Sequence, residues 1–530
     1  MPKPAPAPAV GPHVGRLKLV VFLCGATLMS LEMAGVRILN VYFGSTIYVW
    51  GAIIGIFLGA LSLGYWLGGM LADRAPRFEV LGAVIFLSAL FVFQVPWSAR
   101  PLCEGLGQVD AFGPRLQALS SSLALYFVPS VLMGMVSPFA VRLAAREVKD
   151  VGKVAGRLYA LSTLGSIVGT LGTAFVLVEF VGNRTTILAL GATLVLAAVL
   201  TVDRRALRAK GALLGAVLAV PAWFGAQGPT VTLGPGYQVL EEFDSAYYHI
   251  LVAEGPYGGT RARVLKFDRL VQSGIVVEDE PDAPVRSACG YTDLLHLGMV
   301  VRDAPPERVL FIGGGGGVGP MVFRQDYPSI ERIDVVDVDP AVFRMAREYF
   351  RYPEPGADPV IRSHVADGRL YVLECDARYD YIVLDAYAGG GRIPFHLITK
   401  EFLDETAGLL TDDGVLVINV ISAVRGPQGR LFRSVLKTLE AVDGLPQVYA
   451  FPRSYRGERS ENVILVATRN PRRLSLDQIT RRAARMERRD EIRIRTVDDY
   501  AGHLVTVEPD LGEAVVLTDD YAPTDSMSAP

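Results

Sequence analysis

The sequence predicts an all-α membrane bundle followed by an α/β domain with a doubly wound sheet. High hydropathy is concentrated before about residue 226, whereas the remainder has the composition of an ordinary globular protein. In the second half, Arg308 to Pro320 reads RVLFIGGGGGVGP, an apolar strand that runs into consecutive glycines. Ile333 to Asp339, IDVVDVD, reads as a second strand with acids at its carboxyl end. A strand, a glycine loop, a helix and a strand ending in an acid are typical of a nucleoside-binding βαβ unit, because the acid suits a ribose diol.

Composition excludes several classes of protein. The 530 residues leave room for two or three domains, and the formal net charge of −3 gives no basic excess that would favour nucleic acid. The four cysteines form no CxxC pair and the six histidines show no ligand spacing, so neither a metal site nor a disulfide framework is expected. The first apolar run lacks a small-residue cleavage site and is followed by further runs, which argues against a signal peptide.

Apolar runs of membrane-spanning length follow a Pro/Ala-rich leader, residues 1–15, which we expect to be disordered. They predict a transmembrane domain over residues 16–226 with seven spans, of which the seventh is short and contains Pro221. The expected spans are Lys18–Leu39, Thr46–Met70, Val80–Trp97, Leu116–Val141, Leu158–Phe180, Thr185–Val202 and Gly211–Ala226.

Glycines recur at four-residue spacing in two of these spans. They are Gly51, Gly55, Gly59, Gly64 and Gly68 in the second span, and Gly165 and Gly169 in the fifth. Small residues at this spacing let helices approach closely in lipid, so we expect a compact bundle.

Two acids, Glu32 and Glu179, lie inside spans and are expected to face the bundle interior. They would line a polar cavity for a cationic amine, or hold a structural partner such as Arg37. The stretch Gly64 to Arg77, GYWLGGMLADRAPR, resembles a loop signature of the major facilitator transporters. Six or seven spans would correspond to half of such a transporter.

The second half begins with a Gly/Pro-rich linker, residues 227–236. Residues 237–285 show short strand patterns with a turn signal, Gly-Pro-Tyr-Gly-Gly, at 255–259, and predict a small β-domain. Residues 286–530 hold the glycine strand, preceded by a helix expected at Tyr291 to Val301 and followed by further strands. These strands are expected at 360–368 (VIRSHVADG), 379–385 (YDYIVLD) and 414–420 (GVLVINV).

Three acids stand at or beside strand ends in this half: Asp337, Asp367 and Asp385. Ligands of a doubly wound sheet bind at the carboxyl ends of its strands, so we expect these acids to ring one crevice. Each of them could instead cap a helix or close a turn.

Residues 237–470 resemble the spermidine synthases, which are polyamine aminopropyltransferases, and the whole chain resembles the membrane-embedded spermidine-synthase-like proteins of bacteria. The motifs that carry the resemblance further are GRLYALSTLGSIVGTLGTAF (156–175), IPFHLIT (393–399) and LTDDYAPTD (517–525). The resemblance implies a Rossmann-like methyltransferase fold preceded by a small β-domain. It also implies an S-adenosyl sulfonium donor, no metal, and a small-molecule amine as acceptor.

The resemblance implies roles for individual residues. Asp337 matches the ribose-binding acid, Asp367-Gly368 the pair that holds the adenine, and Asp385 the catalytic acid, which we expect to act as a base. The expected donor-binding residues are Gln272, Gly313, Gly314, Gly315, Gly316, Asp337, Asp367, Gly368 and Pro394, and the expected acceptor-binding residues are Tyr291, Tyr387 and Tyr455.

Two departures from the family pattern affect the amine-recognising half of the expected site. The family's loop reads GGGDGG, and its Asp, which binds the donor's aminopropyl ammonium, is replaced here by Gly316. The family's second catalytic-segment Asp, which holds the acceptor amine, is replaced by Ala388. A smaller departure is Thr292, where the family has histidine or glutamine.

We therefore expect a membrane-bound transferase of the spermidine synthase type that acts on putrescine or a related amine. One alternative is a methyl or 3-amino-3-carboxypropyl transferase that uses ordinary S-adenosylmethionine, which the missing acids favour. Another is a transporter or sensor whose second half binds a nucleoside or polyamine without turnover. The expected partners are the amine acceptor and the lipid bilayer, without nucleic acid, and a homodimer is left open.

The distribution of basic residues bears on location, which we expect to be the bacterial plasma membrane. Basic residues gather before the first span (Lys3, Arg16, Lys18), after the second (Arg74, Arg77), between the fourth and fifth (Arg142, Arg146, Lys149, Lys153, Arg157) and after the sixth (Arg204, Arg205, Arg208, Lys210). The positive-inside rule then places the N-terminus in the cytoplasm. Seven full spans would put the catalytic domain outside, whereas the supply of adenosyl cofactors favours a cytoplasmic domain.

Overall fold

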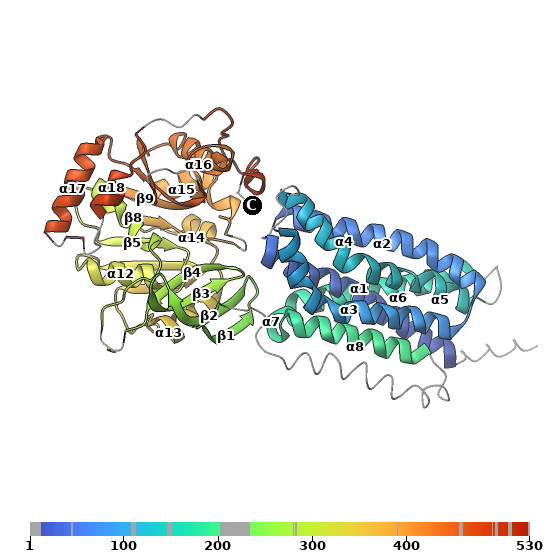
Figure 1. Cartoon of the computed structure of the whole chain (residues 1–530). Helices are drawn as coiled ribbons and strands as arrows, with labels where there is room; N and C mark the ends of the chain where they lie inside the picture. The colour runs from blue at the N-terminus through green and yellow to red at the C-terminus, as the bar shows by residue number, and fades with distance from the viewer. Residues whose placement is uncertain are drawn as a thin grey trace, which may run out of the picture. The chain divides into compact units, whose positions relative to one another are not determined.

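The computed structural model describes residues 12–43, 46–107, 113–145, 151–201, 234–278, 280, 283–388, 391–454, 459–489, 491–492, 497–506 and 511–527 (Figure 1). The chain divides into two compact units, Met1–Val231 and Thr232–Pro530.

The first unit is all helical over its described residues. Its elements are α1 (Pro12–Phe43), α2 (Ile47–Arg74), α3 (Phe78–Gly107), α4 (Gly113–Gly134), α5 (Val136–Ala144), α6 (Val151–Gly172), the π-helical turn η2 (Thr173–Leu177), α7 (Val178–Val181) and α8 (Asn183–Thr201). Six helical stretches are long and apolar enough to cross a membrane, at Gly15–Phe43, Ile47–Arg74, Phe78–Leu106, Arg115–Ala144, Val151–Leu177 and Asn183–Thr201.

Six of the seven expected spans thus have a helical counterpart, and the seventh, 211–226, lies outside the described residues. The third helix is longer than predicted, because it continues through Pro96 and Pro101 to Gly107, where the sequence indicated an end near Trp97. Membrane helices tolerate proline because neighbouring groups satisfy the freed backbone carbonyls.

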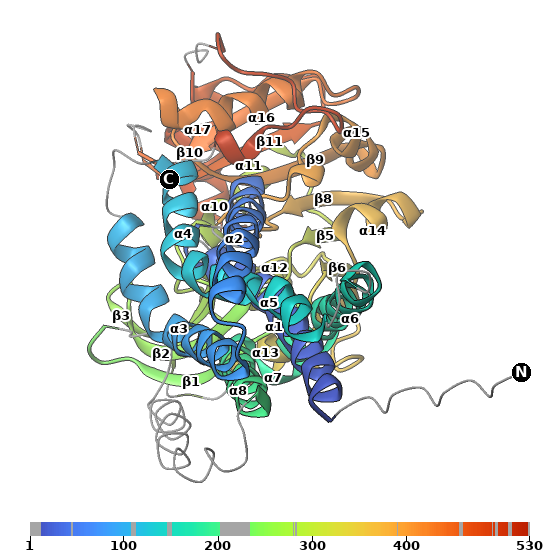
Figure 2. The same cartoon turned by 90° about the vertical axis from the view of Figure 1, so that its right-hand side faces the viewer.

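Glycines bring helices of the bundle into close contact, as their spacing predicted. A Cβ atom at Gly68 would lie 2.6 Å from the Met135 Cα, between α4 and α5, and one at Gly169 would lie 2.8 Å from the Ala26 Cα of α1. Accordingly α1 packs against α6 and α8, and α2 packs against α4 (Figure 2). The prediction is wrong for Gly51, Gly55 and Gly59, which have no described atom within 4 Å of the Cβ position.

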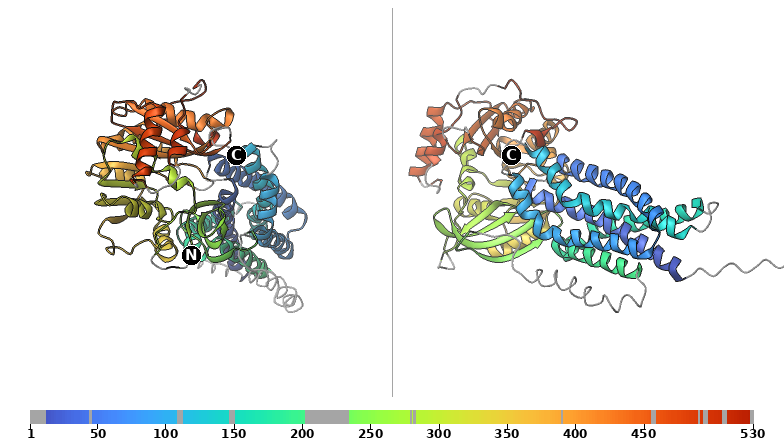
Figure 3. Two further views of the ribbon diagram at one scale, coloured as in Figure 1. Left: turned by 60° about the vertical axis from the view of Figure 1, so that its left-hand side comes forward. Right: turned by 45° about the vertical axis from the view of Figure 1, so that its right-hand side comes forward.

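The second unit begins with a four-stranded antiparallel meander, green in Figure 3. Its strands are β1 (Gln238–Asp244), β2 (His249–Tyr257), β3 (Thr260–Phe267) and β4 (Leu270–Val276). The expected turn at 255–259 is shorter than predicted, because β2 continues through Tyr257 and pairs it with Thr260. Gly258 and Gly259 alone make the turn, with φ of +59° and +83°, which suits a two-residue hairpin.

A seven-stranded sheet follows in the order β10-β11-β9-β8-β5-β6-β7. Its strands are β5 (Arg308–Ile312), β6 (Arg332–Asp337), β7 (Ile361–Val365), β8 (Tyr379–Leu384), β9 (Leu410–Ser422), β10 (Gln447–Pro452) and β11 (Glu461–Thr468). The five neighbouring strands β7, β6, β5, β8 and β9 are parallel, whereas β11 is antiparallel to β9 and β10 is antiparallel to β11. The strand order reverses between β5 and β8, and ligands of such sheets bind at the carboxyl ends beside that point.

Helices cover both faces of this sheet, which makes it the doubly wound, Rossmann-like fold that the sequence predicted. One core contains residues of α10 (Tyr291–Leu294), α11 (Leu297–Val301), α12 (Val318–Asp326), α13 (Pro340–Phe350), α17 (Leu476–Arg488) and α18 (Val497–Gly502). The other contains residues of α14 (Gly368–Glu374), α15 (Lys400–Gly408) and α16 (Arg430–Glu440), together with the 3₁₀ turn η3 (Phe395–Leu397).

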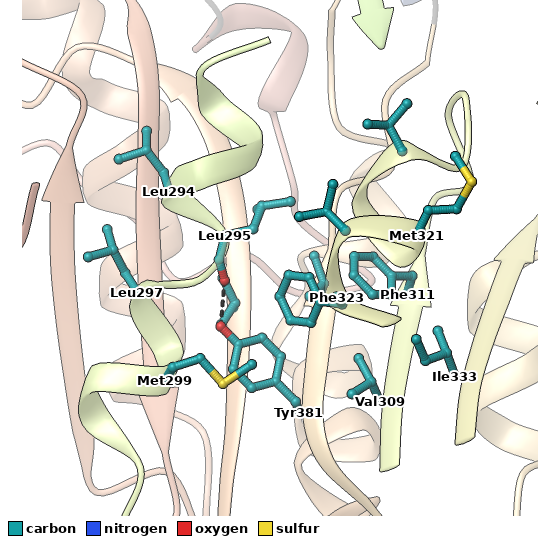
Figure 4. Packing of buried hydrophobic residues seen from close by; sticks show 14 of the residues in the cluster. Leu294, Leu295, Leu297, Met299, Val309, Phe311, Met321, Phe323, Ile333 and Tyr381 are labelled. Carbon is teal, nitrogen blue, oxygen red and sulfur yellow. Dashed lines mark hydrogen bonds between the residues drawn. The ribbon is translucent and has the colours of Figure 1, made fainter. Parts of the chain in front are cut away.

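The single helix predicted over Tyr291 to Val301 is instead two short helices, α10 and α11. Figure 4 shows the cause, since the Tyr381 hydroxyl donates to the Leu295 carbonyl oxygen, which a continuous helix would use for the N–H of residue 299. The Met299 N–H donates to the His296 carbonyl instead.

Candidate active site

The glycine loop is fixed between the carboxyl ends of β6 and β8. The Gly313 N–H donates to the Val336 carbonyl oxygen at 2.8 Å, and the Asp385 N–H donates to the Ile312 carbonyl at 2.9 Å. Gly313 has a φ of +107°, and a Cβ there would collide with the Asp385 carbonyl oxygen. A residue other than glycine would therefore separate the two strand ends. The loop leads into α12, which begins at Val318, three residues earlier than the sequence indicated.

Asp337 lies beside this loop, as its place at the end of β6 predicted. Its Oδ2 accepts from the Gly314 N–H at 2.8 Å, and its Oδ1 accepts from the Asp339 N–H at 3.0 Å. Burial raises the pKa of Asp337 to about 6, although the backbone hydrogen bonds oppose this shift. The Gly315 backbone also donates to this carboxylate. An ionised carboxylate can accept about four hydrogen bonds, so it keeps capacity for a hydroxyl of a ligand.

Asp367 caps α14, which is the alternative that the sequence left open. Its Oδ1 accepts from the Arg369 N–H at 2.9 Å and the Leu370 N–H at 3.2 Å. Its Oδ2 lies 3.2 Å from the Nε2 of His396 in η3. The next residue, Gly368, packs on the end of β5, since a Cβ there would lie 2.6 Å from the Ile312 Cγ2. Asp367 can thus cap α14 and still lie at the carboxyl end of the sheet.

Asp385 directly follows β8, and its carboxylate Oδ1 accepts from the Nδ2 of Asn419 at 2.8 Å. Burial raises the pKa of Asp385 to about 7, while the hydrogen bond from Asn419 and the nearby Tyr291 hydroxyl oppose the shift. A carboxyl that titrates near neutrality at the end of a central strand is suited to accept a proton.

The predicted acceptor-binding tyrosines differ in their surroundings. The Tyr291 hydroxyl lies against Asp385 and donates to the Gln272 carbonyl at 2.6 Å. The Tyr387 hydroxyl is occupied by the backbone, because it donates to the Asn419 carbonyl at 2.7 Å. Tyr455 lies outside the described residues. Pro394 directly precedes η3, the turn that carries His396.

Strand β4 of the meander lies over the glycine loop. A Cβ at Gly315 would lie 3.9 Å from the Gln272 carbonyl oxygen. A Cβ at Gly316 would lie 2.9 Å from the Ser273 Oγ and 3.2 Å from the Phe350 Cδ1. The space beside Gly316, where the resemblance leads one to expect an acid, is therefore partly filled by a serine.

Sequence reasoning missed Asn419, Asn462 and Tyr248. Asn419 holds Asp385, Asn462 holds Asn419, and the Tyr248 hydroxyl donates to the Tyr387 carbonyl at 3.3 Å. Asn419 left one signal, since it is the single polar residue in the run VLVINVI of a buried strand. Tyr248 and Asn462 left none, because their contacts depend on the register of strands distant in sequence.

The arrangement combines a loop of backbone N–H groups, a buried acid on that loop and a second acid that titrates near neutrality. Chemically, such an arrangement can bind a nucleoside and accept a proton from a nucleophile. Among the described residues, no group of three or more His, Cys, Asp or Glu side chains is arranged to hold a metal ion.

Comparison with known proteins agrees with this chemistry. A family model, the spermine/spermidine synthase domain, matches residues 289–442. A polyamine aminopropyltransferase of Vibrio vulnificus is 35% identical over 238 residues, which cover 44% of this chain and 74% of the relative. Polyamine aminopropyltransferase 2 of Streptomyces coelicolor is 28% identical over 474 residues, covering 83% of this chain and 79% of the relative.

The solved structures that resemble the chain include a probable spermidine synthase from Corynebacterium glutamicum. It is 22% identical, with a TM-score of 0.37, over 48% of this chain and 88% of that one. The Streptomyces alignment is longer than the second unit alone, so it extends into the helical unit. From the extent of the Vibrio match, the chain belongs to the polyamine aminopropyltransferase family of enzymes.

Proposed function

We propose that this enzyme transfers an aminopropyl group from an S-adenosyl sulfonium donor to the nitrogen of a small amine, such as putrescine, with Asp385 as the general base. The observation that carries the proposal is the position of Asp385 at the strand-order reversal, beside the glycine loop, with a pKa of about 7. A carboxyl with that pKa is ionised in part at neutral pH and still binds a proton readily.

The residues of the site fit the nucleoside part of the donor. Asp337 keeps lone-pair capacity for a ribose hydroxyl after its backbone hydrogen bonds from Gly314, Gly315 and Asp339. Gly368 lets the chain pack closely on the end of β5, because a Cβ there would lie 2.6 Å from the Ile312 Cγ2, and the Asp367 Oδ2 lies 3.2 Å from the His396 Nε2. These contacts support Asp337 and Asp367 as donor-binding residues.

The donor supplies an electrophile that is already activated, because its sulfur is positively charged. The enzyme has to align the acceptor nitrogen with the carbon–sulfur bond and keep that nitrogen unprotonated. As the carbon–nitrogen bond forms, the carbon–sulfur bond breaks, and its electron pair stays on sulfur as a neutral thioether. The proton that the nitrogen loses goes to the Asp385 carboxylate.

The test is product analysis with the purified full-length protein, given each donor and a set of diamines. Mass spectrometry is expected to show the acceptor heavier by one aminopropyl unit and the donor converted to a thioether nucleoside. Acceptor that gains only a methyl group, or a 3-amino-3-carboxypropyl group, would contradict aminopropyl transfer.

Transfer of a methyl or 3-amino-3-carboxypropyl group from ordinary S-adenosylmethionine has one observation in its favour. Gly316 and Ala388 replace the two acids with which the family recognises amines. A hydrogen bond to a charged group contributes roughly 1.5–3 kcal/mol, so loss of the acid at position 316, which the resemblance assigns to the donor's ammonium, weakens selection of a decarboxylated donor. S-adenosylmethionine, whose carboxylate an Asp at position 316 would repel, is the alternative donor.

Gly316→Asp is expected to shift preference toward the decarboxylated donor, because a carboxylate there would attract the terminal ammonium. The Ser273 side chain must move, since its Oγ lies 2.9 Å and its Cβ 3.0 Å from the new Cβ position, and the double variant with Ser273→Gly removes both atoms. Competition binding measures the preference. A wild-type preference for the decarboxylated donor above about a hundredfold, roughly 2.7 kcal/mol, would contradict a role for the lost acid.

We also propose that the first unit spans the bacterial plasma membrane and leaves the catalytic unit in the cytoplasm. The six candidate spans among the described residues are an even number, so they return the chain to the side on which the first span starts. Basic residues before the first span favour the cytoplasm as that side. A tag placed after Pro530 in intact cells is expected to be inaccessible from outside. Labelling from outside would mean that the segment 211–226 crosses as well.

A further inference from the structure

A chain of two asparagine side chains joins Asp385 to the interior of the sheet. The Asn419 Nδ2 donates to the Asp385 Oδ1 at 2.8 Å, and the Asn462 Nδ2 donates to the Asn419 Oδ1 at 3.0 Å. The chain crosses β8, β9 and β11, which are neighbours in the sheet. Asn419 is only 2% exposed, and a buried amide without hydrogen-bond partners would destabilise the fold.

The direction of these hydrogen bonds determines what Asn419 presents to Asp385. An amide has a donor end and an acceptor end, and the two cannot be exchanged without rotating the group. Because Asn462 donates to the Asn419 oxygen, the Asn419 NH₂ group is turned toward Asp385. The Tyr387 hydroxyl also donates to the Asn419 backbone carbonyl at 2.7 Å, which ties the loop after Asp385 to the same residue.

We propose that Asn419 and Asn462 are positioning residues that hold the Asp385 Oδ1 as a permanent acceptor and leave Oδ2 as the oxygen that takes the proton. An oxygen that accepts an N–H bond binds a proton less well than one that does not. This inference rests on the proposed function, in which Asp385 is the base.

The other groups that face Asp385 do not titrate near neutrality. They are Tyr291 of α10, Cys289 just before it, and Tyr387 of the following loop. Burial raises the pKa of Cys289 to about 11 and raises the pKa values of both tyrosines above their usual value. The positive charge of Arg453 acts on Cys289 and lowers its pKa, against the effect of burial. The pKa values of Asp337 and of Asp293 on α10 are also raised, to about 6. The kcat–pH profile is therefore measured at saturating donor, and Asp385 is assigned by the change in that profile between wild type and the Asn419 variant.

Asn419→Leu removes the N–H donor without adding a charge. The pKa of Asp385 is raised by burial, and the lost hydrogen bond opposed that rise, so the pKa should increase further. A base works only when ionised, so the acidic limb of the kcat–pH profile should move upward by about one pH unit or more. We expect kcat at pH 6 to fall at least tenfold relative to wild type, and kcat at pH 9 to stay within about threefold.

Asn462→Asp tests the same row of hydrogen bonds from the end distant from Asp385. It replaces Asn419→Leu as the test if that variant does not fold. An aspartate at 462 can only accept, so Asn419 must turn its NH₂ group toward it and its oxygen toward Asp385. The Asn419 oxygen would then face an Asp385 oxygen, which favours protonated Asp385. The acidic limb of the kcat–pH profile should again move to higher pH. Asn470→Leu is the matched control, because Asn470 also donates to an acid, Asp413, at 3.2 Å, but lies beyond the other end of β11.

Asp385→Asn is measured alongside the asparagine variants. It distinguishes a failure of the proposed base, Asp385, from a failure of the proposed positioning role of Asn419 and Asn462. If Asp385→Asn keeps its turnover, the base lies elsewhere and the proposed role of Asp385 is wrong. If Asp385→Asn is inactive while both asparagine variants lose activity equally at every pH, the asparagines are structural only and the inference about Oδ2 is overturned. Donor calorimetry on each variant establishes that the site is folded.

Discussion

Asparagine in place of Asp385 is expected to leave the donor bound and to remove nearly all transfer. The Asp385 Oδ1 accepts from Asn419, and the carbonyl oxygen of an asparagine can accept the same hydrogen bond. An amide carries no charge, so it avoids the desolvation that raises the pKa of Asp385 to about 7. The fold and the adjoining loop should therefore survive the change.

An asparagine cannot take a proton, so turnover should fall by the roughly 10²- to 10⁴-fold expected for loss of a general base. Donor affinity should stay within about threefold, roughly 0.65 kcal/mol. Single-turnover transfer and donor calorimetry at the same pH measure the two quantities. Asp412→Asn, at an exposed acid near the start of β9, is the control for loss of a carboxylate.

A structural explanation for Asp385 was open from the sequence, since an aspartate before a glycine-rich loop often accepts from loop N–H groups. Two described N–H groups of this loop bond elsewhere, from Ala388 to the Arg392 carbonyl at 2.7 Å and from Gly391 to the Ala388 carbonyl at 3.2 Å. Near-normal turnover of Asp385→Asn would nevertheless mean that no base is needed or that another group serves.

The sequence predicted the site where local pattern and topology determine it. The apolar strand before Gly313 and the acid at the end of β6 follow from the local sequence pattern, and parallel strands then bring Asp337 and Asp385 to one edge of the sheet. Asp367 was placed near the crevice but its cap of α14 was only one of two readings, because a cap and a ligand-binding acid share the same sequence pattern.

What the sequence did not reveal depends on register between distant strands. Asn419 reaches Asp385 because Ile418 pairs with Leu384, and Asn462 reaches Asn419 because β11 pairs with β9. The end of β2, the break between α10 and α11 and the length of α3 were also missed. For the break between α10 and α11, a contact from elsewhere, the Tyr381 hydroxyl on the Leu295 carbonyl, overrides the local signal.

Alanine in place of Asp337 is expected to weaken donor binding by about tenfold or more. The ribose hydroxyls would lose a charged acceptor, and charge-assisted hydrogen bonds are among the stronger ones in proteins. Calorimetry should be done near pH 8, where the Asp337 carboxyl, with a pKa of about 6, is ionised. Glu348→Ala is the control, since it removes an exposed acid from α13, the helix that follows.

Asp337→Ala also removes the acceptor for the Gly314 and Asp339 N–H groups, so weaker binding alone could reflect a rearranged loop. The ligand can be changed as well as the protein, by comparing the thioether nucleoside 5′-methylthioadenosine with its 2′-deoxy analogue. Wild type is expected to prefer the ribose form by about tenfold, roughly 1.4 kcal/mol, and the variant by less than about threefold. Equal preference in both proteins would place the ribose contact on another residue, whereas loss of the preference with Asp337 assigns the contact to this carboxylate.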